Sequence, residues 1–454
     1  MNMEKTGVLI LAAGKGTRMH SNRPKVLQEI IGEPMLAYVY RAVEPLFSGR
    51  VWTMIGHRGD MVREAFSQRE GHFIVQEPLL GTGHALQMAW PHLQKAGLEN
   101  VLVISGDVPL LSTNLLQTFL NQMQAENSPL GFITLTLPAS GAYGRVVRKN
   151  GEAVGIVEAK DYDATVHGAD RGEINTGVYL FNVAKITPLL SQLTNNNKSG
   201  EYYITDLVGL GVEAGYSIVG AACGDESLLG VNNPAELAAA ENALLGKIRA
   251  HWLASGVSIH FAESVVLGSE VTLEPGAQIS GPCHIYGQTH VEAGAVIEPF
   301  CMIKNSRIAK EARVRAFSHL EDAVVGEACV VGPYARLRPG AVLEESARVG
   351  NFVELKKATL RKGAKANHLT YVGDAIVGEG ANLGAGTITC NYDGKNKFKT
   401  EIGAGAFIGS NSALVAPVKI GANSLVAAGS VITKDVPDNA MAFARARQVN
   451  REEK

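Results

Sequence analysis

The amino-acid sequence predicts two domains of different class: an α/β domain with a Rossmann-like, mostly parallel sheet, and after it a parallel β-helix. Three observations support this prediction. The chain has 454 residues, which is more than one hydrophobic core usually spans. Its first half alternates short apolar runs with helix-length segments, and its second half repeats an aliphatic residue every six positions.

Composition and charge argue against several other classes. The chain is 46% hydrophobic and 19% charged with a net charge of −2, which gives no reason to expect nucleic acid or a membrane surface as a partner. No apolar stretch approaches the ~20 residues that span a bilayer. The first apolar run, residues 7–13, lacks the flanks of a signal peptide, so we expect a cytoplasmic protein. The five cysteines contain no C-x-x-C pair, so neither a zinc site nor a disulfide framework is predicted.

The first half has the pattern of a sheet that is covered on both faces. Largely apolar runs precede four loop-forming residues: V-L-I-L-A-A before Gly14, V-W-T-M-I before Gly56, V-L-V-I-S before Gly106 and F-I-T-L-T-L before Pro138. Such runs, separated by segments long enough for helices, are typical of parallel strands in α/β proteins. We expect this domain to cover residues 1–231.

A helix is predicted to join the two domains, over residues 232–255. Asn233 suits the N-cap, Pro234 the first helical position and Glu236 the third, and an alanine- and leucine-rich run follows. We expect the second domain over residues 256–454, including a C-terminal tail.

The second half is periodic. With single-residue slips and one interruption, the aliphatic positions are Leu267, Leu273, Ile279, Ile285, Val291, Ile297, Ile303, Ile308, Val314, Leu320, Val325, Val331, Leu337, Leu343, Val349, Leu355, Ile402, Ile408, Leu414, Ile420, Val426 and Ile432. The residue two positions earlier is small or β-branched, as at Ala277 and Ala341. Two inward positions in six residues describe one short strand on each side of a triangular coil. Cys283, Cys301 and Cys329 fall on this small track and are predicted to be core residues rather than catalytic thiols.

The repeat is interrupted between Thr389 and Thr400. The segment C-N-Y-D-G-K-N-K-F-K carries polar and basic residues where aliphatic residues are expected. A loop expelled from a regular solenoid is a typical place for function.

A glycine-rich loop follows the first apolar run. Gly14 and Gly16 would let backbone amides approach phosphate oxygens, while Lys15, Arg18 and Lys25 carry the positive charge that offsets a triphosphate. The glycine spacing fits neither the P-loop nor the strict dinucleotide-binding pattern. The loop therefore predicts a nucleotide site of another kind.

This loop and seven later segments together resemble the nucleoside-diphosphate-sugar pyrophosphorylases. In order, the segments are L-A-A-G-K-G-T-R-M, P-K-V-L, Q-E-P-L-L-G-T-G-H-A, G-D-V-P-L, Y-G-R, I-V-E, E-I-N-T-G and G-V-N-N. The resemblance implies an α/β nucleotidyltransferase. Its binding residues for UTP and the sugar nucleotide would be Leu11, Ala12, Ala13, Gly14, Arg18, Lys25, Gln76, Gly81, Thr82, Ser105, Gly106, Asp107, Gly144, Glu158, Asn175 and Asn232.

Within that set the resemblance implies a Mg²⁺ site at Asp107 and Asn232. Asp107 also follows a strand end, where open α/β sheets place ligands, although an aspartate there can instead cap the next helix. Lys25 would stabilise charge on the transferring phosphate. At Ser105 some relatives have tyrosine instead.

Six further residues of the set would recognise the two organic parts of the product. The residues implied to select uracil are Gln76, Gly81 and Thr82. Those implied to hold the amino sugar are Gly144, Glu158 and Asn175.

The two-track repeat resembles the hexapeptide repeat of left-handed parallel β-helices, over residues 262–434. Within it, G-P-Y-A-R-L-R-P-G, G-N-F-V-E-L-K-K, N-H-L-T-Y-V-G-D and N-L-G-A-G-T-I-T-C-N-Y-D-G resemble a family of bifunctional N-acetylglucosamine-1-phosphate uridyltransferase and glucosamine-1-phosphate acetyltransferase enzymes. The resemblance implies that UDP-N-acetylglucosamine is made from glucosamine 1-phosphate, acetyl-CoA and UTP, as a precursor of cell-wall peptidoglycan and lipopolysaccharide.

Acetyl transfer to an amine needs a base, and histidine has a suitable pKa. His368 lies in the N-H-L-T-Y segment and matches the catalytic histidine of the family, whereas His284, His290 and His319 match no site segment and are expected to be structural. The residues implied to bind the sugar phosphate are Arg338, Lys356, Tyr371 and Asn382. Those implied to bind acetyl-CoA are Ala385, Asn391, Tyr392, Ser410, Ala428 and Arg445. Lys397 is implied to have a supporting role, with Asn391, at the reacting centre in the expelled loop. Relatives form trimers with acetyl-transfer sites between subunits, which implies a homotrimer.

Two other functions fit parts of the sequence. The chain could be a pyrophosphorylase whose β-helix only assembles or regulates it. The β-helix could also be a binding scaffold or a carbonic anhydrase, but the latter needs converging zinc-binding histidines, and six-residue spacing places His284 and His290 on different sides of the coil.

Overall fold

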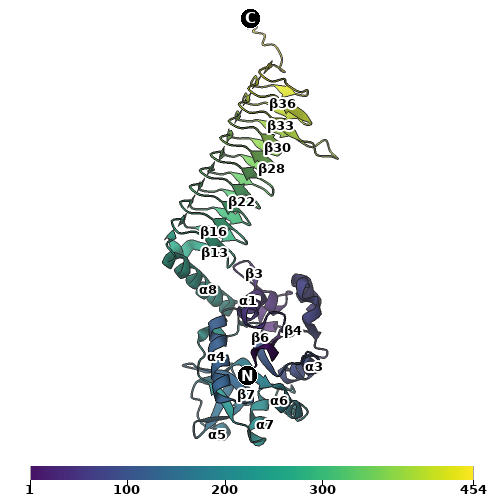
Figure 1. Ribbon diagram of the computed structural model, residues 1–454, viewed down its shortest axis with the longest axis vertical. Helices are drawn as coiled ribbons and strands as arrows, with labels where there is room; N and C mark the ends of the chain where they lie inside the picture. Colours follow the sequence, from purple (N-terminus) through teal and green to yellow (C-terminus); the bar gives the residue numbers. More distant parts are fainter. Residues whose placement is uncertain (1, 453–454) are drawn as a thin grey trace. The chain divides into compact units, whose positions relative to one another are not determined.

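The computed structural model describes residues 2–452, which form two compact units divided between Asn242 and Ala243 (Figure 1). The outermost limits of the expected domains, residues 1 and 454, lie outside the described residues. The division falls within helix α8 (Pro234–Ala254), whose N-cap is Asn233 as predicted, since its side-chain oxygen accepts a hydrogen bond of 3.0 Å from the Glu236 amide. Within residues 2–452, no helix combines the length and apolarity needed to cross a membrane.

The first unit is built on one sheet of nine strands. These are β1 (Thr6–Leu11), β4 (Val51–Ile55), β5 (Phe73–Val75), β6 (Asn100–Ser105), β7 (Leu130–Thr136), β8 (Arg145–Lys149), β9 (Glu152–Val157), β10 (Glu173–Asn182) and β11 (Ile218–Ala221). The main order is β11-β7-β10-β6-β1-β4-β5, with β8 and β9 joined through β10. The predicted parallel pairing holds for β1 with β4 and β6, for β4 with β5 and for β7 with β11. Strand β10 is antiparallel to its neighbours β6 and β7. The sequence of β10 does not predict this reversal of direction.

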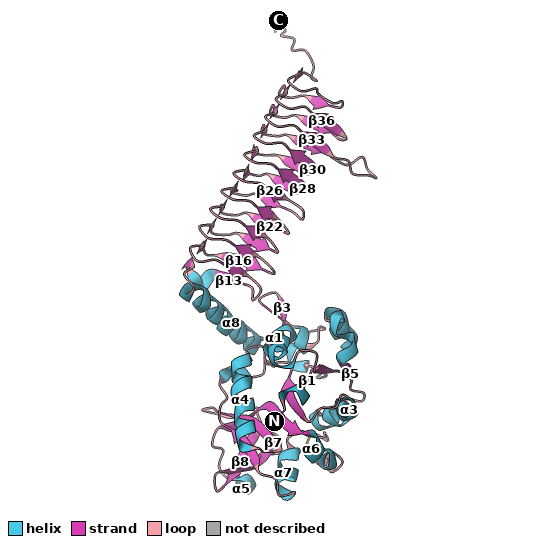
Figure 2. Ribbon diagram, viewed as in Figure 1, coloured by secondary structure: helices cyan, strands magenta, loops and turns pink. Residues whose placement is uncertain are grey.

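Helices cover both faces of this sheet (Figure 2). They are α1 (Met35–Phe47), α2 (Gly59–Ala65), α3 (Thr82–Lys95), α4 (Thr113–Glu126), α5 (Ala164–His167), α6 (Val183–Leu190) and α7 (Asp206–Glu213). Val8 and Ile10 of β1 pack in one core with α1 and α4, whereas Leu9 packs in a second core with α3, α6 and α7. Burial on both faces explains why the sequences of these strands are largely apolar rather than alternating between apolar and polar residues.

Short elements complete the first unit and the start of the second. A small hairpin pairs β2 (Glu29–Ile30) with β3 (Glu33–Pro34). The 3₁₀ turns are Met3–Lys5, Thr17–Met19, Lys25–Leu27, Ser67–His72, Glu226–Leu228 and Ala262–Ser264. Two of them, at Thr17 and Lys25, place the basic side chains of the glycine-rich loop region.

The second unit is a parallel β-helix whose strands form two long sheets. One sheet contains β12 (Ser258–His260), β15 (Gln278–Ser280), β18 (Val296–Ile297), β21 (Arg313–Val314), β24 (Val330–Val331), β27 (Arg348–Asn351), β29 (Lys365–His368), β31 (Asn382–Leu383), β34 (Phe407–Ile408), β37 (Leu425–Val426) and β39 (Met441–Ala442). The repeat therefore extends beyond the predicted limits, 262 and 434, at both ends.

The other sheet follows two sides of each coil, one after the other. It contains β13 (Val265–Leu267), β14 (Thr272–Leu273), β16 (Cys283–Tyr286), β17 (His290–Val291), β19 (Met302–Lys304), β20 (Arg307–Ile308), β22 (His319–Glu321), β23 (Val324–Val325), β25 (Arg336–Leu337), β26 (Val342–Leu343), β28 (Glu354–Leu360), β30 (Tyr371–Val377), β32 (Ile388–Cys390), β33 (Thr400–Ile402), β35 (Ala413–Val415), β36 (Val418–Ile420) and β38 (Val431–Ile432). The predicted loop leaves this sheet between β32 and β33 and projects from the side of the β-helix (Figure 1).

The core of the β-helix consists of the predicted aliphatic and small positions. Parallel pairing places Ile297 beside Ile279 and Val314 beside Ile297, so each inward residue stacks on its counterpart in the previous coil. Cys283, Cys301 and Cys329 are buried in this core as predicted, and burial raises the pKa of their thiols to about 12, 11 and 11 respectively.

We expect Leu320→Ala to lower the free energy of unfolding by about 2–5 kcal/mol, because Leu320 is fully buried and the coil cannot collapse around the cavity. Val324→Ala is the control, since the Val324 side chain is 41% exposed on the same coil and should change stability by no more than about 0.5 kcal/mol. Urea unfolding of the full chain measures both. Equal losses would contradict the inward placement of the repeat.

Candidate active sites

A cleft of about 510 Å³ opens in the first unit where β1 and β6 end. It is lined by most of the residues predicted to bind the nucleotide: Leu11, Ala12, Ala13, Gly14, Lys25, Gln76, Gly81, Thr82, Ser105 and Asp107. The Gly106 amide donates to the Leu11 carbonyl oxygen at 2.9 Å and ties these two strand ends together. The predicted residues thus come from separate segments to one cleft.

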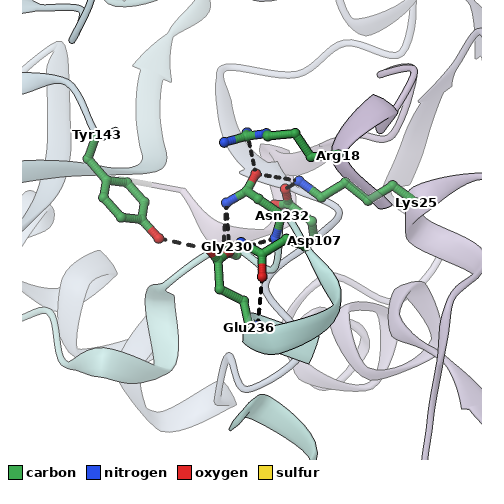
Figure 3. Close-up of polar contacts among 8 residues, drawn as sticks. Arg18, Lys25, Asp107, Tyr143, Gly230, Asn232 and Glu236 are labelled. Atoms are coloured by element: carbon green, nitrogen blue, oxygen red, sulfur yellow. Dashed lines mark hydrogen bonds and ion pairs between the residues drawn. The ribbon is translucent and has the colours of Figure 1, made fainter. Parts of the chain in front are cut away.

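The Lys25 ammonium group connects three of these segments (Figure 3). Its Nζ donates to the Asp107 carboxylate and, at 2.8 Å, to the side-chain oxygen of Asn232. Arg18 donates to the same Asn232 oxygen at 3.1 Å. Both Lys25 and Asp107 are largely shielded, with side chains 14% and 16% exposed, so the carboxylate and amide oxygens face one point that attracts a cation.

The loop that carries Asn232 is held by residues that the sequence did not single out for the site. Glu236, in the first turn of α8, accepts from the Asn232 backbone amide at 2.7 Å and from its side-chain amide at 3.2 Å. That amide also donates to the Gly230 carbonyl at 2.9 Å, which fixes its oxygen toward Lys25. Burial raises the pKa of Tyr143, whose hydroxyl is 3.5 Å from the Gly230 carbonyl oxygen (Figure 3). Because Glu236 was predicted only as a helix-capping residue, the sequence did not indicate its contact with Asn232.

Hydrogen bonds and close contacts hold the segment that is predicted to select a base. The buried Gln76 side chain donates to the Gly81 carbonyl oxygen at 2.9 Å, and its amide nitrogen is 3.2 Å from Nδ1 of His84. Gly81 has φ of 103°, and a Cβ there would lie 2.6 Å from the Tyr202 carbonyl oxygen, so glycine is required. The Thr82 hydroxyl accepts from the Ile204 amide at 3.1 Å.

The three residues predicted to hold an amino sugar lie together. The Asn175 amide donates to the Gly144 carbonyl oxygen at 2.9 Å, and a Cβ on Gly144 would be 3.7 Å from the Glu158 carboxylate. The buried Thr205 hydroxyl donates to Glu158 at 3.1 Å. Burial raises the pKa of the Glu158 carboxyl, and nearby acidic residues add to the effect.

Asp206 is one of those acidic residues and was not predicted. Burial, together with repulsion from Asp161, raises the pKa of its carboxyl to about 6. It is the first residue of α7 and follows Thr205 directly, so it lies next to the group that bonds Glu158. The residues next to Asp206 in the sequence do not indicate that it is buried near another carboxylate.

In the second unit, His368 lies at the end of β29, on the edge of a corner of the β-helix. Its Nδ1 is 2.8 Å from the side-chain oxygen of Asn351, one coil earlier. The two side chains line a cavity of about 310 Å³ together with Arg315, Arg348 and Asn367. Asn351 was not predicted, although its position 17 residues before His368 is one coil of the repeat.

On the other side of this corner lies a cluster of cations. The Lys397 ammonium in the projecting loop faces Lys356 and, with burial and Arg338, lowers the pKa of the Lys356 amine. Arg338 also pairs with Glu354 at 2.8 Å. Like charges gathered in this way suit a dianionic ligand.

Tyr371 and Asn391 lie close to one another, beside this cluster. A Cβ on Gly373 would approach Asn391 Nδ2 to 2.8 Å and would also overlap the Tyr371 hydroxyl. The same Asn391 amide donates to Asp374 at 2.5 Å. Asn382 begins β31 and pairs with Lys365 of the strand that carries His368.

Several residues predicted to bind acetyl-CoA lie at the same corner of the β-helix as His368, on the coils that follow it in the sequence. Backbone bonds run from Asn411 to the Ala385 carbonyl at 2.7 Å and from Gly429 to the Ser410 carbonyl at 2.8 Å. Arg445 lies after the last strand, yet its guanidinium donates to the Ala428 carbonyl at 2.8 Å. Tyr392 is exposed in the projecting loop and donates to Gly394 at 2.6 Å.

We expect Asp206→Asn to stabilise the fold in a pH-dependent way. Since the folded pKa of about 6 lies above the ordinary 3.8, the stabilisation from the protonated acid is present below 3.8 and is lost as pH rises through 6. Above about pH 7 the free energy of unfolding of the variant should exceed that of wild type by about 1 kcal/mol. This is less than the full pKa shift implies, because the side chain is partly exposed to solvent. Urea unfolding at acidic and neutral pH measures this. A difference independent of pH would contradict it.

Comparison with family models matches three parts of the chain. The MobA-like NTP transferase domain matches residues 8–138, which include the cleft around Lys25. The GMPPB C-terminal domain matches residues 267–351, and the bacterial transferase hexapeptide, with six repeats, matches residues 399–434. Both halves therefore resemble known transferase modules.

Curated relatives match nearly the whole chain. The bifunctional protein GlmU of Nitratidesulfovibrio vulgaris (strain DSM 19637 / Miyazaki F) is 61% identical and covers 98% of this chain and 97% of its own. GlmU of Oleidesulfovibrio alaskensis is 57% identical, covering 99% and 98%, and GlmU of Lawsonia intracellularis is 45% identical, covering 98% and 97%. At this identity and coverage, the chain belongs to the family of bifunctional GlmU proteins.

Proposed function

We propose that the two units perform successive steps of UDP-N-acetylglucosamine synthesis, acetyl transfer in the β-helix and then uridylyl transfer in the α/β unit. The chain is a glucosamine-1-phosphate acetyltransferase and an N-acetylglucosamine-1-phosphate uridyltransferase, which uses acetyl-CoA and UTP. One observation supports the assignment of one reaction to each unit. Each unit has its own group of converging charged residues, around Lys25 in the first and around Lys356 in the second.

In the uridyltransferase site, an oxygen of the sugar phosphate attacks the α-phosphorus of UTP. A new P–O bond forms as the bond to pyrophosphate breaks, and no base is needed because the attacking phosphate is already ionised. Lys25 and Arg18 offset the charge that builds up on the transferring phosphate, and the loop at Gly14 offers backbone amides to the triphosphate.

Mg²⁺ suits the same site. Asp107 and Asn232 present a carboxylate and an amide oxygen, the ligand types that Mg²⁺ prefers, at a point where the Lys25 ammonium is already bound. Held by Asp107 and Asn232, the ion would supply positive charge that offsets the charge of the phosphate groups. Glu236 would hold Asn232 in place as a ligand, because its carboxylate accepts from the Asn232 backbone amide.

The organic parts of the substrate are recognised on either side of this point. Gln76, Gly81 and Thr82 form the hydrogen-bonded segment that selects uracil. Gly144, Glu158 and Asn175 form the group that holds the acetylated sugar, where a close carboxylate accepts hydrogen bonds from hydroxyl groups.

In the acetyltransferase site, the amine of glucosamine 1-phosphate attacks the carbonyl carbon of acetyl-CoA. The C–N bond forms, the C–S bond breaks, and His368 accepts the proton that the amine loses. Arg338 and Lys356, supported by Lys397, bind the sugar phosphate, while Tyr371 and Asn382 bind the sugar. The acetyl-CoA groove comprises Ala385, Asn391, Tyr392, Ser410, Ala428 and Arg445.

We also propose a homotrimer that works in the cytoplasm, where UTP and acetyl-CoA are made. A row of exposed aromatic side chains supports assembly: Phe300, Phe317 and Tyr334 stack with ring centroids 4.7 and 4.8 Å apart and are 54%, 46% and 47% exposed. The row follows the corner on which His368 lies, so another subunit would cover both.

We expect Lys25→Met to reduce pyrophosphate release from UTP and N-acetylglucosamine 1-phosphate by about 10²–10³, because the charge on the transferring phosphate loses its partner. Coenzyme A release should stay unchanged. Arg23→Met is the control, since Arg23 is exposed in an ion pair of 2.7 Å with Glu29. A wild-type rate of pyrophosphate release for the Lys25 variant would contradict the assignment.

We expect His368→Ala to lower coenzyme A release by about 10²–10⁴, the usual contribution of a general base. Pyrophosphate release by the same preparation should equal that of wild type, which shows that the first unit is intact and that the loss is confined to the β-helix. His284→Ala is the matched control, because His284 lies on the outer face of the same β-helix and bonds Tyr286 at 2.8 Å. Equal losses in the two histidine variants would rule out a special role for His368.

A further inference from the structure

We propose that Asn351 is a positioning residue for the acetyl transfer, which fixes the His368 imidazole in the form that has its proton on Nδ1. The inference rests on the proposed role of His368 as base. The Asn351 side-chain oxygen lies 2.8 Å from His368 Nδ1, within hydrogen-bond reach. If this oxygen accepts the Nδ1 proton, Nε2 has a free lone pair to receive the proton from the amine.

The backbone holds the two residues opposite one another. Asn351 and His368 are direct partners in the parallel pairing of β27 and β29, and the Leu369 amide donates to the Asn351 carbonyl at 3.1 Å. The preceding residue, Gly350, allows this approach, because a Cβ there would overlap the Asn367 carbonyl. The pair is therefore set by the register of the coils.

Groups on both sides of the pair keep it in place. Phe352 follows Asn351 and stacks on Tyr334 with ring centroids 5.3 Å apart. Thr370, whose side chain is 2% exposed, donates from its hydroxyl to the His368 carbonyl at 2.7 Å. These contacts hold the Asn351 and His368 backbones on either side of the pair, and a base that is already positioned avoids the cost of ordering it for the reaction.

The residues around His368 leave Asn351 as the side chain that selects the tautomer of the imidazole. The other polar side chains lining the cavity are Arg315, Arg348 and Asn367, and among the described residues none of these three has a hydrogen bond to the imidazole. The arginines carry donors only and so cannot accept the Nδ1 proton. Asn351 supplies the missing acceptor.

The test compares Asn351→Ala with Asn351→Asp in the full chain. Losing the acceptor should lower kcat for coenzyme A release by about 10–100-fold, the size of effect seen when a partner that orients a metal-binding histidine is removed, with little change in KM. Aspartate retains an acceptor and should restore part of that loss. Asn367→Ala, in the same cavity, is the matched control, and pyrophosphate release should be unchanged in all three variants.

A spectroscopic readout separates positioning from a structural effect. In ¹⁵N-histidine-labelled protein, with His368 identified by comparison with His368→Ala, the wild type should show the Nδ1–H form and Asn351→Ala should lose it. An Nε2–H form in the wild type, or a wild-type kcat for Asn351→Ala, would overturn this inference. If His368→Ala itself keeps full coenzyme A release, the proposed base is wrong; if only Asn351→Ala does, the base stands and the positioning role fails.

Discussion

The second unit depends on one constraint: in every six residues, one large and one small side chain must point inward and stack on those of the previous coil. Pairs such as Ile279 with Ile297 enforce this register along the β-helix. Corner residues are therefore stacked as strictly as core residues. That stacking brings Asn351 beside His368 and places Ala385, Ser410 and Ala428 on successive coils above them, so the packing of the core also builds the site.

The first unit uses a different principle, the convergence of loops at the ends of strands. Lys25, Asp107 and Asn232 are distant in sequence, and Lys25 Nζ bonds to both oxygens. Lys25 lies in a turn after β1 and Asp107 follows the neighbouring strand β6, whereas Asn232 is held by Glu236 at the start of α8. The helix cap at Asn233 and the candidate metal ligand at Asn232 are thus adjacent parts of one short segment.

The sequence predicts much of this arrangement because repetition and motifs are local. The aliphatic track, the buried cysteines, the interruption after Thr389 and the N-cap at Asn233 are each readable from short windows, and the structure confirms them. The reversal of β10 is not readable, because a buried antiparallel strand has the same apolar pattern as a parallel one. Asn351, Thr205 and Asp206 were missed because their roles arise from contacts across coils or loops, which no single window contains.

The central claim is that one chain couples two chemically independent sites in a fixed order of reactions. The most direct measurement follows coenzyme A and pyrophosphate together in wild-type protein supplied with glucosamine 1-phosphate, UTP and Mg²⁺, with and without acetyl-CoA. The account predicts that coenzyme A is released first and that pyrophosphate release requires acetyl-CoA. Pyrophosphate released at the same rate without acetyl-CoA would contradict it.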